Sequence, residues 1–257
     1  MKKKLLATIA VLAALPLTMT ACGKANTYKQ EITDAWTKTN SYESASYSYQ
    51  ISYTNEDGIQ VNSVNEGAYN RTEETWSQIS DYGTQGIGKQ EEVLSPEEIH
   101  IRYDLDGSGW GDWGKINSER TDYASFLKTL FEQNISFENI DSIEKAEENG
   151  EIIYTLTYKK SYMRAQVEEE LEAARDYLEL LQETSSDLTE LDTLEQEVES
   201  LERRAEATGQ AIYYVDKEGN LTGLGSRIEM EGGAGTYIML RLSEFGEVSF
   251  EGYTENP

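Results

Sequence analysis

One segment of the sequence has the residue types and the spacing of a metal site. Residues 104–115 read DLDGSGWGDWGK, and Asp104, Asp106 and Ser108 stand at the first three ligand positions of an EF-hand calcium loop. Such a loop ends in a bidentate glutamate, but its twelfth position here is Lys115, whose charge would repel the ion. We therefore interpret the segment as a tight turn without a metal ion. A weak calcium site formed by Asp104, Asp106 and Ser108 is the alternative.

The other residues that support catalysis are too few for the common active sites. His100 is the only histidine and Cys22 the only cysteine, so Ser-His-Asp and Cys-His catalysis and zinc sites are not expected. His100 alternates with apolar residues of its strand, and we expect it to be exposed to solvent. The glycine-rich residues 232–235 lack the lysine and the following helix of a phosphate-binding loop. The sequence therefore predicts no catalytic residue, no cofactor and no enzymatic activity.

The N-terminal residues have the order of a bacterial export signal. Three lysines at positions 2–4 precede an apolar run over residues 5–17, which is too short for a stable membrane span. Residues 19–22, MTAC, resemble the lipobox of bacterial lipoproteins, in which the cysteine receives a diacylglyceryl group and the signal is cut before it. We expect a signal peptide over residues 1–21, lipidation of Cys22 and a short tether over residues 22–27. An ordinary signal peptide with an incidental cysteine is the alternative.

The composition restricts the partners of the chain. Its formal net charge is −26, and removal of residues 1–21 takes three lysines and no acids, which lowers the charge to −29. This charge argues against binding to nucleic acid and to anionic lipid head groups. A single cysteine allows no internal disulfide, so the stability of the fold must come from an apolar core.

Alternating tyrosines predict an antiparallel sheet that is covered on one face. Over residues 46–54, Tyr47, Tyr49, Ile51 and Tyr53 alternate with serine and glutamine, which is typical of a half-buried strand. An Asp-Gly pair at positions 57 and 58 favours a hairpin turn. Further strands are expected at residues 59–69, 73–82, 98–105, 151–159, 211–215, 221–230, 237–242 and 248–253, and helices at residues 28–39 and 120–133.

Residues 164–208 have a different composition, with 15 acidic residues, four arginines, and neither glycine nor proline. Apolar residues recur every three or four positions, as in a coiled coil, and the phase breaks at residues 184–186. We predict two antiparallel helices over residues 163–183 and 187–208, and one continuous helix is the alternative. The expected seam places Val167, Leu171, Ala174, Leu178 and Leu181 against Leu191, Leu194, Val198, Leu201 and Ala205.

The order of these segments resembles the bacterial lipoproteins of the LolA and LppX type, and most closely the small acidic lipoproteins of Gram-positive bacteria. The resemblance rests on the lipobox-like cysteine, the first helix, the tyrosine-rich strands and the phrase YYVDKEGNLTGLGSRIEM at residues 213–230. It covers residues 28–161 and 209–257, so the acidic residues 162–208 read as an insertion. The resemblance implies an α+β fold in which a curved antiparallel sheet, an incomplete β-barrel, packs against helices; here it would carry an inserted antiparallel helical hairpin.

The resemblance also implies an apolar ligand, often an acyl chain, on the concave face of the sheet. The equivalent residues here would be Tyr47, Tyr49, Ile51 and Tyr53, although the same residues could simply be core beneath a helix. We therefore expect a lipoprotein anchored at the extracytoplasmic face of the cell membrane that binds an apolar or amphiphilic ligand such as a lipid. The alternative is a cell-surface interaction module whose protein partner binds the acidic hairpin.

Overall fold

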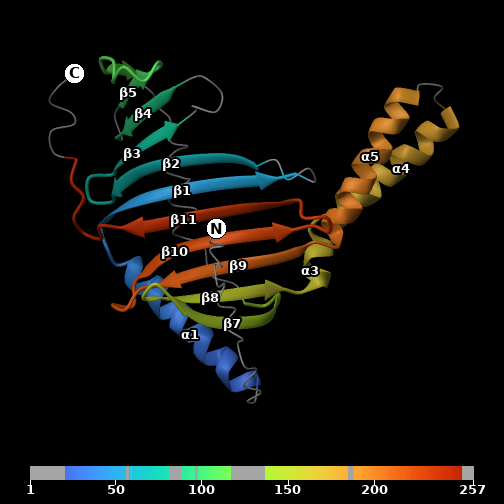
Figure 1. Cartoon of the computed structure of the whole chain (residues 1–257), viewed down its shortest axis with the longest axis horizontal. Coiled ribbons are helices and arrows are strands. Elements are labelled where there is room, and N and C mark those ends of the chain that lie inside the picture. Colours follow the sequence, from blue (N-terminus) through green and yellow to red (C-terminus); the bar gives the residue numbers. More distant parts are fainter. Residues whose placement is uncertain are drawn as a thin grey trace, which may run out of the picture.

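The computed structural model describes residues 21–55, 58, 60–81, 88–95, 98–116, 137–184 and 188–250. Its described part contains one antiparallel sheet of 11 strands in the order β6-β5-β4-β3-β2-β1-β11-β10-β9-β8-β7 (Figure 1). The outermost strands β6 and β7 do not pair with each other, so the curved sheet stays open and the predicted fold class is confirmed. The strands are β1 (Ser44–Thr54), β2 (Gln60–Asn70), β3 (Thr75–Asp81), β4 (Lys89–Leu94), β5 (Ile99–Asp104), β6 (Gly114–Ile116), β7 (Ile140–Glu148), β8 (Glu151–Tyr158), β9 (Thr208–Val215), β10 (Leu221–Glu229) and β11 (Gly235–Ser243), and the helices are α1 (Ala21–Thr39), α3 (Lys160–Ala165), α4 (Glu168–Thr184) and α5 (Leu188–Ala205).

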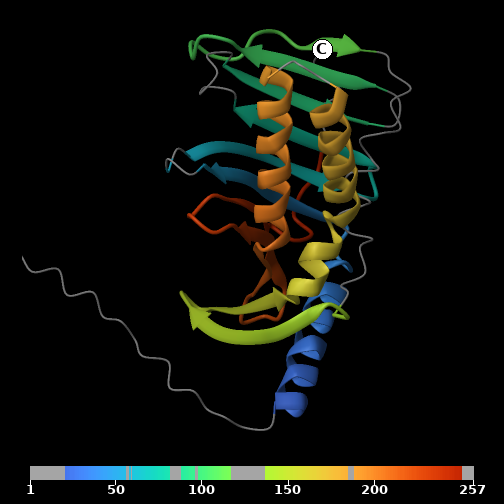
Figure 2. The same ribbon diagram turned by 90° about the vertical axis from the view of Figure 1, so that its right-hand side faces the viewer.

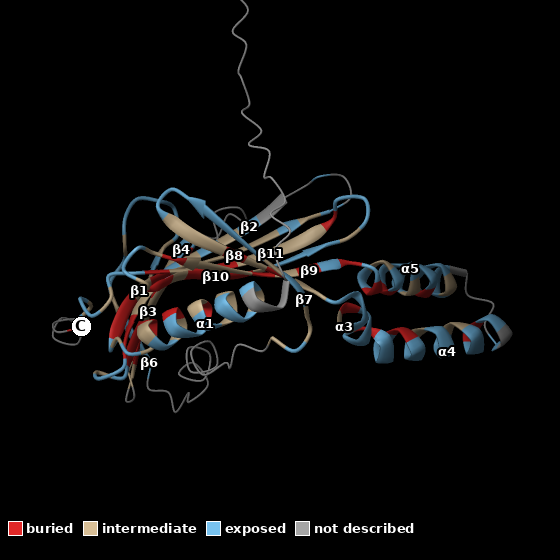
Figure 3. Ribbon diagram, turned by 90° about the horizontal axis from the view of Figure 1, so that it is seen from below, coloured by how far each residue is buried: buried red, intermediate tan, exposed pale blue. Residues whose placement is uncertain are grey.

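Helix α1 begins at Ala21, seven residues before the expected start at Tyr28, so the expected tether over residues 22–27 is helical. The helix packs on β7, β9 and β10 through Ile32, which is fully buried, and Ala35. These two residues share a cluster with Tyr154, Leu156, Ala211, Val215 and Leu221. We call the face of the sheet that α1 covers the helix face (Figure 3). No described helix is long and apolar enough to cross a membrane.

A polar contact fixes α1 against the outer strands β7 and β8. The hydroxyl of Tyr154 donates a hydrogen bond of 2.5 Å to Glu31, and Nζ of Lys145 lies 2.8 Å from the same carboxylate. Burial alone would raise the pKa of Glu31, but the hydrogen bonds from Lys145 and Tyr154 outweigh it and lower that pKa. Burial, together with the hydrogen bond to Glu31, raises the pKa of Tyr154 to about 12. At neutral pH, Glu31 is therefore ionised and Tyr154 is protonated.

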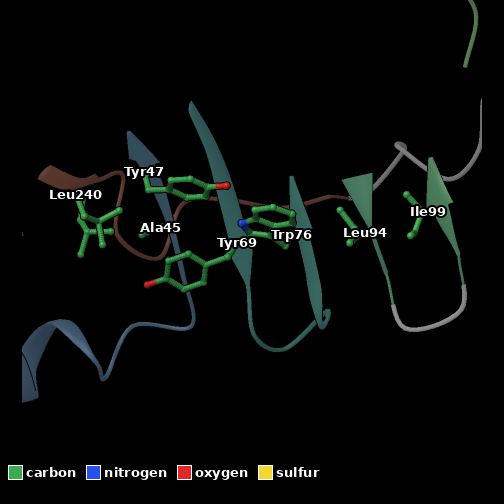
Figure 4. Packing of buried hydrophobic residues seen from close by; sticks show 8 residues of the cluster. Ala45, Tyr47, Tyr69, Trp76, Leu94, Ile99 and Leu240 are labelled. Carbon is green, nitrogen blue, oxygen red and sulfur yellow. The ribbon is translucent and has the colours of Figure 1, made fainter. Parts of the chain in front are cut away.

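A second cluster continues the helix face across β1 to β5 (Figure 4). The rings of Tyr47 and Trp76 stack with their centroids 6.2 Å apart. The Tyr47 side chain lies over Gly67, where a Cβ atom would be 2.6 Å from the tyrosine hydroxyl, so only glycine leaves room for it. Trp36 of α1 packs against both clusters, which makes the core continuous. The buried members of the second cluster are Ala45, Tyr47, Tyr69, Trp76, Leu94, Ile99, Leu240 and Leu242.

Helices α4 and α5 form the predicted antiparallel hairpin, and the alternative of one continuous helix is wrong. The buried residues of the seam are Val167, Leu171, Leu181, Leu194, Leu201 and Ala205, and Ala174 and Val198 are partly buried in it. The hairpin projects from the sheet at the end where β8 stops and β9 starts (Figures 1 and 2). Those strands are neighbours, with Thr157 opposite Gln210, so the chain leaves and re-enters the sheet at one place.

The remaining differences between the expected and the observed elements are of three kinds. Strands β4, β6 and β7 were not expected, because their sequences KQEEVL, GKI and IDSIEKAEE have too few apolar residues for a visible alternation. The expected strand at residues 248–253 is wrong over its described residues 248–250. There, the side chain of Asn70 donates to the Val248 carbonyl, and the Phe250 amide donates to Glu73. The expected helix at residues 120–133 lies outside the described residues.

Candidate functional site

Two carboxylates of the 104–115 segment accept hydrogen bonds from amides of the same loop. The Gly109 amide donates to Asp104 at 3.3 Å, and the Ser108 amide donates to Asp106 at 3.0 Å. Hydrogen bonds from the Ser108 side chain and amide lower the pKa of Asp106. Among the described residues, no three acidic, histidine or cysteine side chains gather as a metal site would require. The loop geometry is that of a tight turn, and the absence of a bound metal stays a prediction.

The two tryptophans of this segment enclose an arginine of β5. The guanidinium carbon of Arg102 lies 4.9 Å from the ring centroid of Trp110 and 4.4 Å from that of Trp113. Arg102 also forms an ion pair with Glu91 of β4, whose side chain is only 7% exposed. Stacking on two indole rings and pairing with a desolvated carboxylate both favour an arginine at this position. The segment therefore covers the face of the sheet opposite the helix face.

The expectation that His100 is exposed is wrong. The residue is buried, its ring lies edge-on to Trp113 with the centroids 6.4 Å apart, and its Nε2 atom lies 3.4 Å from Glu98. The alternation did place His100 on the polar face, but it could not show that the following loop folds back over that face. His100 is thus part of the structural cluster beneath the loop.

We predict that Arg102→Leu lowers the free energy of unfolding by about 2–3 kcal/mol, because it leaves the buried Glu91 carboxylate without its cation. The double variant Arg102→Leu/Glu91→Leu should recover roughly half of that loss, since no charge remains to be desolvated. Urea unfolding measures both values. Lys89→Leu is the matched control, because its ion pair with Asp81 is about half exposed and should contribute less than about 0.5 kcal/mol. Equal losses in Arg102→Leu and Lys89→Leu would contradict the role given to Arg102.

The helix face becomes steadily more exposed along β1. Ala45 is fully buried, Tyr47 is 6% exposed, Tyr49 and Ile51 are partly buried, and Tyr53 is 50% exposed. Helix α1 covers the other part of the face, on β7, β9 and β10. The half of β1 that ends at Thr54 therefore borders an uncovered region, which we call the open end of the helix face.

The four residues expected to bind a ligand do lie on one face, but they have different surroundings. Tyr47 belongs to the core, and its hydroxyl donates to the Ser77 carbonyl at 2.9 Å. Burial, and to a smaller extent the neighbouring Tyr53, raises the pKa of Tyr49. Ile51 and Tyr53 lie beyond the packed cluster, at the open end.

Pairing between the strands places further residues beside Ile51 and Tyr53. One row crosses β1, β11, β10, β9 and β8 at Ile51, Ile238, Ser226, Ala211 and Leu156. The next row crosses β1, β11, β10 and β9 at Tyr53, Thr236, Ile228 and Gly209. Neither row contains a charged side chain, and Ile228 is 38% exposed. These partners were missed because the sequence shows each strand's alternation but not the order in which the strands pair.

The base of the hairpin forms one wall of the open end. Met163 of α3 lies against Gly209, where a Cβ atom would be 2.3 Å from the methionine sulfur. The rings of Tyr158 and Tyr162 pack beside it with their centroids 5.2 Å apart. Burial raises the pKa of both Tyr158 and Tyr213, so these hydroxyls stay neutral. The open end thus combines apolar side chains with neutral hydroxyls, a surface suited to binding an apolar group rather than to acid–base chemistry.

Comparison with known proteins gives distant likenesses to solved structures. No protein-family model matches the chain, and no curated protein sequence matches it. The structure of LprF from Mycobacterium bovis is 8% identical with a TM-score of 0.42, over 87% of this chain and 95% of that chain. A LolA-superfamily protein from Nitrosomonas europaea is 7% identical with a TM-score of 0.28, over 89% of this chain and 97% of that chain. At these TM-scores the likenesses do not establish a function, which we infer from the residues of this chain.

Proposed function

We propose that the protein is a membrane-anchored extracytoplasmic lipoprotein that binds an apolar or amphiphilic ligand, such as a lipid, at the open end of its helix face. The observation that carries the proposal is the pair of uncharged residue rows beside Ile51 and Tyr53. The longer row crosses five strands, and α1 buries its last two residues, Ala211 and Leu156. Its uncovered part, from Ile51 to Ser226, crosses three strands that are about 4.8 Å apart, so it extends roughly 10 Å. A surface of that length accommodates part of an apolar chain.

The exposed apolar groups supply the free energy of binding. Tyr53 and Ile228 are 50% and 38% exposed, and both lie in the same row. Each CH₂ group that a ligand buries against such side chains contributes roughly 0.8 kcal/mol. Tyr49, Ile51 and Tyr53 would contact the ligand, while Tyr47 would support them from the core. The resemblance of the sequence to LolA- and LppX-type lipoproteins agrees with this role and with a function that is not enzymatic.

We expect saturable binding of an apolar dye, N-phenylnaphthylamine, whose fluorescence increases in apolar surroundings. In a Cys22→Ala background, which avoids detergent, Ile51→Glu should weaken the dye affinity at least about tenfold, because it puts a charge where an apolar group must be buried. Ser52→Glu is the matched control, since it adds the same charge one residue away on the opposite face. The proposal fails if Ile51→Glu binds the dye as the unmodified chain does, or if no saturable binding occurs.

A further inference from the structure

Helix α4 carries an apolar stripe beside the seam that it forms with α5. Ala173, Tyr177 and Leu180 follow one another at spacings of four and three residues, so they lie on one side of the helix. Tyr177 and Leu180 are 48% and 54% exposed, although the same helix already buries its seam in the hairpin. We call these three residues the Tyr177 stripe. Two large apolar side chains on one turn, outside the seam and among charged residues, indicate a contact surface.

Carboxylates line both sides of the Tyr177 stripe. On α4, the acids next to it are Glu169, Glu172, Asp176 and Glu179, and none of the four has an ion-pair partner within the described ranges. On the side toward α5, the hydroxyl of Tyr177 donates a hydrogen bond of 3.2 Å to Glu190 of that helix. The rim of the stripe is therefore negative on both helices.

Two arginines of the hairpin already form ion pairs with acids inside it. Arg175 lies 2.6 Å from Glu202, and Arg204 lies 3.6 Å from Glu170. These pairs join α4 to α5, and neither of them includes one of the four acids of α4 beside the stripe. Positive charge beside those four acids is left for a partner to supply.

The hairpin also presents this surface far from the start of the chain's first helix. In both side views, the first turn of α1 lies at the bottom of the molecule and the tip of the hairpin lies near the top (Figures 1 and 2). The outer sides of α4 and α5 are exposed, while the buried residues follow the seam (Figure 3). A partner can therefore reach α4 without displacing a strand of the sheet.

We propose that the Tyr177 stripe docks a cationic amphipathic helix of a partner protein. The partner's apolar side would pack on Tyr177 and Leu180, and its lysines and arginines would lie beside Glu172, Asp176 and Glu179. A second copy of this hairpin is a poor fit, because its acids would oppose the same acids. The surface is separate from the open end of the helix face, so the two proposals can fail independently.

The test uses the full chain and a synthetic 18-residue helical peptide of leucine and lysine that carries a fluorescent label. Fluorescence anisotropy at about 50 mM salt should show saturable binding, which weakens as salt screens the charges. Tyr177→Gln and Leu180→Gln keep good helix formers at exposed positions, so the hairpin should remain folded. Together they should weaken binding about tenfold or more, whereas Ile116→Gln, at an equally exposed apolar residue on the sheet edge, should leave it unchanged.

Charge reversal separates this site from general attraction to an acidic protein. The pair Glu172→Lys and Glu179→Lys should weaken binding about tenfold, and the pair Glu144→Lys and Glu147→Lys on β7 should change it less than twofold. Equal effects of the two pairs would mean that only overall charge matters and would overturn the proposal. Binding of a leucine–glutamate peptide with the same affinity, or no loss in the Tyr177 and Leu180 variants, would also overturn it.

Discussion

A Cys22→Ala variant is expected to leave the membrane fraction and appear in the soluble fraction. The residues MTAC at positions 19–22 resemble a lipobox, and Cys22 is the only thiol that could accept a diacylglyceryl group. Two acyl chains together are sufficient for stable attachment, whereas one chain binds a membrane only weakly. With the anchor removed, the strongly negative chain should not adsorb to anionic lipid.

The variant is judged by fractionation after cell lysis and by the mass of the N-terminal peptide. The unmodified chain should give a peptide that begins at Cys22 and carries acyl groups. Thr27→Ala, close by in the same helix, should stay with the membrane and is the control. If Cys22→Ala fractionates with membranes to the same extent as the control, the anchor assignment is wrong.

The second large effect is expected on the stability of the fold, where α1 packs on the sheet. Ile32→Ala should lower the free energy of unfolding by about 3 kcal/mol, because Ile32 is fully buried and truncation leaves a cavity that rigid strands cannot fill. Its neighbours Tyr154 and Leu156 belong to β8, and its neighbour Leu221 belongs to β10. A void there weakens the contact of the helix with both strands.

Thr33→Ala is the control for this prediction. Thr33 is exposed and its hydroxyl only donates to the Lys29 carbonyl within the helix, at 2.8 Å, so its removal should change stability by less than about 0.5 kcal/mol. Thermal or urea unfolding of both variants measures the difference. A loss in Ile32→Ala as small as that in Thr33→Ala would mean that α1 does not pack on the sheet as described.

The elements that can be predicted from the sequence are those in which apolar residues recur at a regular spacing. In β1, four apolar residues alternate with polar ones, and in the hairpin a seam of ten residues breaks phase only at the turn. Strand β7 was missed because it lies at the sheet edge, where most of its residues are exposed and charge replaces alternation. The sequence likewise placed His100 on the polar face but not beneath Trp113, because contacts between a loop and a strand leave no periodic signal.

The same limit applies to the candidate site. Alternation was enough to predict that Tyr49, Ile51 and Tyr53 share one face, because one strand carries them. It could not find Ile238 or Ile228, since their place beside β1 depends on the pairing of β11 with both β1 and β10. Nor could it assign Tyr47 to the core, which depends on the space left by Gly67 on the next strand. Strand order is a property of the folded chain, and it decides which apolar residues meet.

Native mass spectrometry of the protein, purified in mild detergent from its own membrane, tests the proposed ligand most directly. Our account predicts an added mass beyond that of the chain and its acyl anchor, which an organic solvent releases. The added mass should be lost in Ile51→Glu and retained in Ser52→Glu, because only Ile51 lies on the helix face. A wild-type protein without added mass, or one whose added mass persists unchanged in Ile51→Glu, would contradict the proposal that the open end of the helix face binds an apolar ligand.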